Sequence, residues 1–155
     1  MQVMTTTWLS ASEMRAWRNF IESVSTLTAA MENDLAPFGL TNGDYEVLVR
    51  LSEAESERLR MCDLATALQL SPSGLTRRLD GLVTTGLVER VACPSDRRVM
   101  FAALTPAGHA KLAEAAPDHV ASVRKRFFKG LSHEQVQSLG EIFETMRANL
   151  TACPS

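Results

Sequence analysis

The sequence predicts a mainly α-helical fold that carries one small β-hairpin. Three observations predict it. Apolar residues recur at steps of three and four near both ends of the chain, as in amphipathic helices. A helix is predicted between Ser71-Pro72 and Gly86. Ser71 is a typical N-cap, Pro72 a typical first-turn proline, and Gly86 a typical terminal glycine. Two short β-prone runs, 88–92 and 99–104, flank a polar turn.

Composition restricts the kind of protein. A chain of 155 residues with 45% hydrophobic residues fits one domain over 1–155. The net charge of −2 argues against binding driven by overall positive charge, but a basic patch on an acidic protein still permits DNA binding. The start, MQVMTTTW, has no basic or apolar leader, and no run approaches the roughly 18 apolar residues of a membrane helix. We expect no secretory signal, no membrane contact and a cytoplasmic location.

Metal-binding and catalytic side chains show no recognisable spacing. Cys62, Cys93 and Cys153 form neither a metal-finger pattern nor an even-numbered framework, and the histidines lack zinc-ligand spacing. The sequence also lacks a glycine-rich phosphate loop, a catalytic carboxylate pair and a nucleophile motif. We therefore expect no enzyme, no metal and no cofactor.

The first helix is expected to begin after Ser10 and to end at Gly39. Ser10 precedes Glu13 by three residues, which is a capping box. Its apolar seam is longer than one small domain usually needs from its first helix: Met14, Trp17, Ile21, Val24, Met31 and Leu35.

Two short helices and a connection are expected next. Thr41 and Asp44 form a cap that opens a helix through Leu51. The polar segment 52–60, SEAESERLR, is expected to be a solvated connection, and 61–68 a second short helix. Together with the helix from Ser71 and the hairpin, these elements predict a winged helix-turn-helix module over residues 40–105.

The helix over 71–85 is expected to have one buried and one polar face. At about 100° per residue, the buried face carries Leu75, Leu79, Leu82 and Val83. The opposite strip fits a major groove about 12 Å wide: Ser73, Thr76, Arg77, Asp80 and Thr84. We expect Arg77 to contact a guanine edge, and Ser73 and Thr76 to contact phosphates or thymine methyl groups. Arg78 lies on the flank, where a phosphate contact or an internal ion pair suits it better.

The hairpin turn carries charge at its tip. Pro94 cannot donate a ladder hydrogen bond, so the turn starts there. An arginine on a thin hairpin can reach the minor groove, whose narrow A·T stretches concentrate negative potential. We expect Asp96 to hold such an arginine extended by a charge-assisted hydrogen bond. The predicted DNA-binding residues are Ser71, Ser73, Thr76, Arg77, Arg78, Asp96, Arg97 and Arg98.

Two further helices are expected after the hairpin. Thr105-Pro106 begins a long helix that ends at Gly130, and Pro117 inside it is expected to kink it. Ser132 opens the last helix in a second capping box.

The apolar stripes of segments 8–38 and 106–150 lie outside the winged module. Packing within one chain explains any one of them, but all of them together favour a dimerisation bundle of terminal helices. A two-fold homodimer also matches a pseudo-palindromic DNA site.

Short motifs along the second half of the winged module point to one family. They are Asp63-Leu64-Ala65, Ser71-x-Ser73, Leu75-Thr76-Arg77, Asp80-x-Leu82, Gly86-Leu87-Val88-x-Arg90, Asp96-Arg97-Arg98 and Leu104-Thr105-x-x-Gly108. In these motifs the chain resembles the MarR family of bacterial transcription regulators. The resemblance implies a homodimer on the terminal helices, the helix from Ser71 in the major groove, and Arg98 as the wing arginine with Asp96 as its companion.

The resemblance also implies a small effector, commonly a phenolic or aromatic acid, between the dimer helices and the winged module. Carried over by position, its pocket has four candidate lining residues: Trp17, Phe20, Tyr45 and Leu48. Core packing explains each of them as well. Tyr45 is the best candidate because a buried hydroxyl needs a partner.

We therefore predict a dimeric, sequence-specific DNA-binding regulator, a repressor released or modulated by a small ligand. Two alternatives stay open. One is a winged module that binds a protein instead of DNA. The other is a redox sensor that uses Cys93. The peroxide-sensing branch of the family has a cysteine near its N-terminus, whereas in this chain no cysteine precedes Cys62. Nothing near Cys93 in the sequence clearly lowers its pKa.

Overall fold

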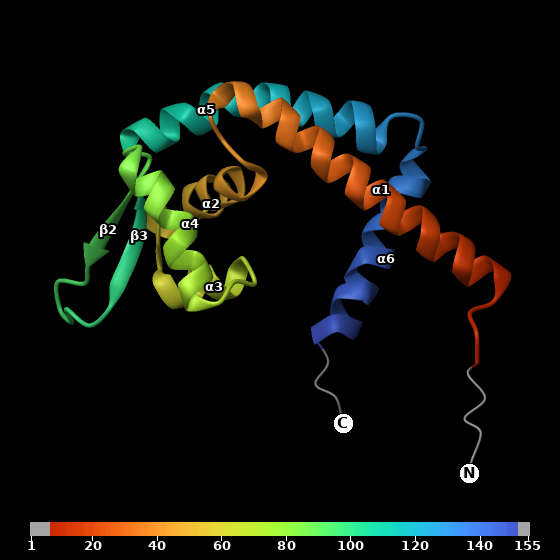
Figure 1. Cartoon of the computed structure of the whole chain (residues 1–155), viewed down its shortest axis with the longest axis horizontal. Helices are drawn as coiled ribbons and strands as arrows, with labels where there is room; N and C mark the ends of the chain where they lie inside the picture. Colours follow the sequence, from red (N-terminus) through yellow and green to blue (C-terminus); the bar gives the residue numbers. More distant parts are fainter. Residues whose placement is uncertain (1–6, 152–155) are drawn as a thin grey trace, which may run out of the picture.

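The winged module and the terminal helices occupy opposite parts of an elongated molecule. The computed structural model describes residues 7–151, and within that range no helix is long and apolar enough to cross a membrane. Figure 1 shows α2, α3, α4 and the β2–β3 hairpin at one end and α6 at the other, with α1 and α5 running between them. The elements are α1 (Ala11–Leu35), α2 (Asn42–Ser52), β1 (Arg58–Arg60), α3 (Met61–Ala67), α4 (Pro72–Thr84), β2 (Val88–Ala92), β3 (Met100–Leu104), α5 (Pro106–Val123) and α6 (His133–Thr151).

The predicted helix caps are present. In α1 the Glu13 carboxylate accepts from the Ser10 backbone N–H at 2.7 Å, and the Ser10 hydroxyl accepts from the Glu13 N–H at 3.3 Å. The Ser10 hydroxyl also donates to the Glu13 carboxylate at 2.6 Å, and this bond, together with the one from the Ser10 N–H, lowers the pKa of Glu13. Thr41 and Asp44 form the same box at the start of α2. The capping residues therefore determine where these helices begin.

The segment predicted to be a solvated connection contains a strand. β1 pairs antiparallel with β3, Arg58 opposite Ala103 and Arg60 opposite Phe101, so the sheet order is β1-β3-β2. Leu59 packs against the core between the two arginines, and the Arg58 guanidinium lies over the Phe101 ring at 5.2 Å. The prediction was wrong because three residues with a single apolar side chain give no periodicity, and their pairing partner lies far along the chain.

The core of the winged module consists mainly of leucines from all its helices. Leu75, Leu79 and Leu82 of α4 are buried as predicted, while Val83 is half-buried. They pack with buried residues of α2, α3 and the sheet: Val47, Leu48, Leu51, Leu64, Ala65, Val88, Ala102 and Leu104. The polar strip of α4 consequently faces outward.

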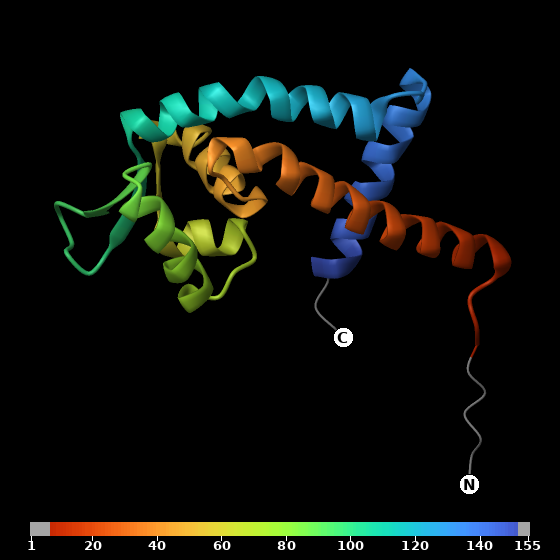
Figure 2. The same ribbon diagram turned by 45° about the horizontal axis from the view of Figure 1, so that its top comes forward.

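The long helices are joined near their ends. Pro117 lies inside one continuous α5, and the irregular stretch comes later, as a π-helical turn at Arg124–Phe128. Asp34 of α1 accepts a hydrogen bond from the buried Ser122 hydroxyl and pairs with Arg126 at 3.1 Å. Figure 2 shows α5 running above α1, with α6 crossing α1. Gly130, with φ 90°, ends the turn before α6.

Candidate nucleic-acid interface

The outward face of α4 is exposed and polar. Ser73, Thr76 and Arg77 are all exposed, opposite the buried leucines of the same helix. Ser71 has a structural task as well, because its hydroxyl caps α4 by accepting from the Gly74 N–H at 3.1 Å. The helix thus presents a short row of hydroxyls and one guanidinium to solvent.

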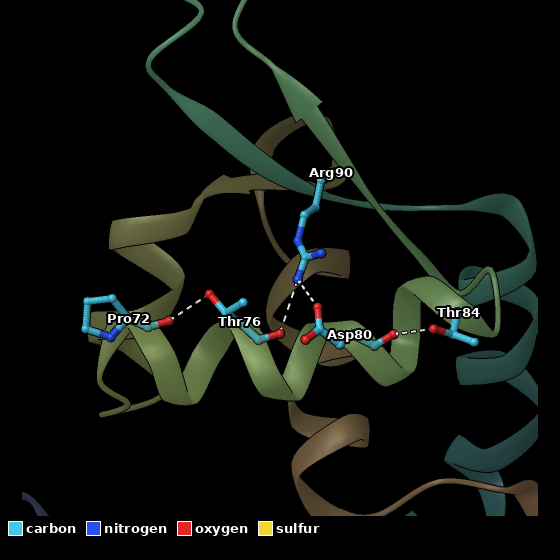
Figure 3. Close-up of polar contacts among 5 residues, drawn as sticks. All are labelled: Pro72, Thr76, Asp80, Thr84 and Arg90. Carbon is cyan, nitrogen blue, oxygen red and sulfur yellow. Dashed lines mark hydrogen bonds and ion pairs between the residues drawn. The ribbon is translucent and has the colours of Figure 1, made fainter.

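Two threonines of this face use their hydroxyl protons within the helix. Thr76 donates to the Pro72 carbonyl at 2.9 Å, and Thr84 donates to the Asp80 carbonyl at 2.8 Å (Figure 3). In this geometry each threonine offers a methyl group and an acceptor lone pair to a ligand, rather than a donor.

Arg78 differs from the other predicted contacts because it is half-buried. Its Nη1 donates to the Thr41 hydroxyl at 3.3 Å, and its guanidinium lies so close over Gly43 that a Cβ there would collide with it. Of the two expectations for Arg78, the internal ion pair is absent among the described residues, where a hydrogen bond to a hydroxyl at the start of α2 stands instead. Arg78 ties α4 to α2.

An ion pair that the sequence did not reveal joins α4 to the wing. Arg90 of β2 donates from Nη2 to the Asp80 carboxylate at 2.7 Å and to the Thr76 carbonyl at 3.1 Å (Figure 3). Helical phase predicts Asp80 on the polar strip, whereas Arg90 stands out in the sequence only as part of the Gly86-Leu87-Val88-x-Arg90 motif. Ten residues and a tight turn separate the two side chains, so no helical or strand spacing indicates the pair.

The wing turn keeps its arginines free of side-chain partners among the described residues. Arg97 and Arg98 are exposed. Asp96 does not hold a guanidinium: its carboxylate accepts from the Arg98 backbone N–H at 3.0 Å, and its carbonyl accepts from the Val99 N–H at 3.0 Å. The expectation for Asp96 was wrong about its partner. In a tight turn, the short Asp96 side chain reaches the backbone N–H two residues on more easily than it reaches the guanidinium of an arginine. Asp96 shapes the loop that carries both arginines.

The four predicted effector residues do not line a common pocket. Trp17 and Phe20 line an apolar groove of about 710 Å³ between α1 and α6. Tyr45 lines a separate hollow of about 500 Å³. Leu48 is fully buried in the core of the winged module and lines neither. The prediction failed for Leu48 because this residue of α2 is part of the buried hydrophobic core.

The hollow at Tyr45 includes a histidine that the prediction left out. The Tyr45 and His119 rings lie 4.3 Å apart, and Nδ1 of His119 is buried without a hydrogen-bond partner in the described part of the chain. Burial lowers the pKa of His119, against the opposing effect of Asp34, and burial raises the pKa of Tyr45. The polar rim includes the Arg50–Glu46 ion pair at 3.8 Å.

Comparison with known proteins assigns the family. The sequence model of the MarR family matches residues 40–100, which is the winged module. The crystal structure of AbsC, a MarR family transcriptional regulator from Streptomyces coelicolor, is 44% identical, covers 94% of this chain and 98% of its own, and superposes with a TM-score of 0.90. The chain belongs to the MarR family.

Two further MarR-type relatives extend the comparison. Sco3205, a MarR family transcriptional regulator from Streptomyces coelicolor crystallised in complex with DNA, is 36% identical, with 97% of this chain and 95% of that chain covered and a TM-score of 0.91. The HTH-type transcriptional repressor YetL of Bacillus subtilis (strain 168) is 27% identical over 142 residues, with coverage of 89% and 84%. This MarR-family chain is thus a transcriptional regulator, and these relatives are regulators rather than enzymes.

The cysteines show one departure from the sequence prediction for this MarR-family chain. Hydrogen bonds from Ser95, and then from the Asp96 N–H, lower the pKa of the Cys93 thiol, an effect that the sequence did not indicate. Cys62 is an exposed free thiol, and Cys153 lies outside the described residues. Among residues 7–151, no three His, Cys, Asp or Glu side chains gather as a metal site requires.

Proposed function

We propose that this chain acts in the cytoplasm as a homodimeric repressor that binds a pseudo-palindromic DNA operator. One observation carries the proposal: α4 and the β2–β3 hairpin lie at the same end of the molecule (Figure 1). The outward face of α4 is polar and exposed, and the hairpin loop carries the exposed Arg97 and Arg98. A helix and a hairpin so placed suit a major groove and its neighbouring minor groove. The DNA-bound relative Sco3205 and the repressor YetL support the same function.

The predicted contacts divide into three kinds. We assign base contacts to Arg77 and Thr76, and phosphate contacts to Ser73 and to the loop carrying Arg97. Arg98 enters the minor groove. Ser71, Arg78 and Asp96 act indirectly, since each already holds part of α4 or of the wing in place.

The dimer follows from the apolar surface of the terminal helices. Large side chains of α1 and α6 stay exposed in one protomer, among them Trp17 at 54% and Ile142 at 53%. The Phe143 ring lies between two others along the groove: it is stacked on Phe127 and tilted against Phe20, with centroids 6.4 and 6.5 Å apart. Monomers rarely leave an apolar surface of this extent uncovered, and two-fold pairing would cover it with the same surface of a second copy.

Arg98→Ala tests the DNA-binding proposal. The probes are duplexes that the wild-type protein enriches from a random library. We expect binding to weaken by roughly tenfold at unchanged thermal stability, because one cation leaves an exposed loop. Arg124→Ala removes a cation that is also exposed, from the π-helical turn, and is expected to bind like wild type. Equal affinity of the Arg98 variant and wild type would contradict the proposal.

We place the effector in the hollow at Tyr45 and His119. The two adjacent rings, tilted by 37°, provide an aromatic wall. The hollow joins α1, α2 and α5, so a ligand there contacts both the dimer helices and the winged module. A panel of hydroxybenzoic acids should release DNA from the wild type at lower concentration than from Tyr45→Ala. Equal sensitivity of both proteins would exclude this pocket.

A further inference from the structure

Arg90 and Asp80 form a contact whose placement matters for DNA binding. Asp80 belongs to the outward strip of α4, and its side chain is 58% exposed. An unpaired carboxylate in this position would face the DNA phosphates and repel them. Arg90 neutralises it at 2.7 Å, and its own side chain is only 31% exposed.

The same guanidinium also fixes β2 against α4. Its Nη2 bonds both the Asp80 carboxylate and the Thr76 carbonyl, so one residue of β2 is joined to two positions of α4 that lie one helical turn apart (Figure 3). Arg90 lies between the turn at Gly86, where the chain leaves α4, and the loop that carries Arg98. The direction in which the wing projects from α4 therefore depends on this residue.

We propose that Arg90 is a positioning residue for DNA binding, which masks the Asp80 carboxylate and sets the angle of the wing. This inference rests on the proposed function. Arg90 does not contact DNA itself in this scheme, since its Nη2 donates to α4.

Three variants test the inference: Arg90→Ala, Asp80→Asn, and both together. Binding to the enriched duplexes is measured by gel shift, and wing contacts by hydroxyl-radical footprinting of the outer minor grooves. We expect Arg90→Ala to weaken binding by roughly tenfold and to lose the outer protection while the central protection remains. Adding Asp80→Asn should recover part of the affinity, because the repelling charge is gone, without restoring the outer protection.

If Arg90→Ala weakened binding only by destabilising the fold, removing the Asp80 carboxylate as well would not restore affinity. Recovery of affinity in the double variant therefore supports the inference. Arg90→Lys keeps a cation beside Asp80 but loses the planar guanidinium whose Nη2 bonds both Asp80 and Thr76, so its DNA affinity is expected to lie between those of wild type and Arg90→Ala. It carries the test if Arg90→Ala does not fold. Lys111→Ala, which breaks the Lys111–Glu114 pair on α5, controls for the loss of one positive charge, since the Lys111 side chain is 30% exposed.

The outcomes separate the two proposals. If the wild type enriches no duplex, DNA binding as proposed fails. If the wild type binds but Arg90→Ala keeps both its affinity and its outer footprint, or the double variant binds no better than Arg90→Ala, only the role of Arg90 is overturned.

Discussion

Gly108 permits the close approach of α5 to the corner between α4 and β2. A Cβ at this position would meet the Leu87 carbonyl oxygen and the Leu104 side chain. The Thr105 hydroxyl lies at the same corner, where it bonds the Gly86 carbonyl at 2.7 Å. The Leu-Thr-x-x-Gly motif is thus explained by backbone packing that joins the dimer helix to the winged module.

Gly108→Ala is expected to lower the free energy of unfolding by about 1–3 kcal/mol, because backbone must shift to admit the methyl group. Urea denaturation measures the change. Gly81→Ala, at an open position of α4, is the control and should stabilise by up to about 1 kcal/mol through helix propensity. Equal stabilisation by both changes would contradict the packing argument.

His119 should make stability depend on pH. Burial lowers its pKa below the ordinary value of 6.5, so the unfolded chain takes up the proton first as pH falls. We expect the stability that neutral His119 contributes to be fully present above about pH 6.5, the ordinary pKa of the unfolded chain. It is lost as pH falls toward the lower pKa of His119 in the folded protein. Thermal unfolding between pH 5 and pH 8 measures it.

His119→Phe keeps a ring beside Tyr45 and removes a buried nitrogen without a partner in the described residues, so it should reduce this pH dependence without loss of stability. His133→Phe, on an exposed histidine at the start of α6, serves as the control. A slope that survives His119→Phe intact would assign the dependence to other groups.

At the scale of single elements, local sequence determined most boundaries. The caps at Ser10, Thr41 and Ser71 begin their helices as expected, because a side chain that satisfies a free N–H acts within three residues. β1 was missed because its stability comes from pairing with β3, a partner that local pattern does not contain.

Thr41→Ala is expected to cost about 1 kcal/mol of stability, since α2 loses its cap and Arg78 loses its hydrogen-bond acceptor. Thr66→Ala in α3 removes a hydroxyl that bonds only its own helix, at the Cys62 carbonyl, and should be neutral or slightly stabilising. Differential scanning calorimetry compares the two, and equal effects would show that the cap contributes nothing.

At the scale of the whole molecule, the groove between α1 and α6 predicts dimerisation. Ile142→Glu places a charge in the proposed interface and should shift sedimentation velocity toward the monomer and weaken DNA binding, because burying an unpaired carboxylate is costly. Gln137→Glu adds the same charge to another face of α6 and should remain dimeric. A monomeric wild type at micromolar concentration would contradict the proposed dimer.

The sequence by itself determined the helices, their caps, the wing and the family resemblance, because these depend on periodicity, capping and motifs within short stretches. It also separated the buried and outward faces of α4, since helical phase does so without knowledge of neighbours. Only the tertiary structure decided that Arg90 pairs with Asp80, that Asp96 braces the turn, and that Tyr45 faces His119 while Leu48 is core. Each of these depends on how separate elements are oriented toward one another, which local pattern does not encode.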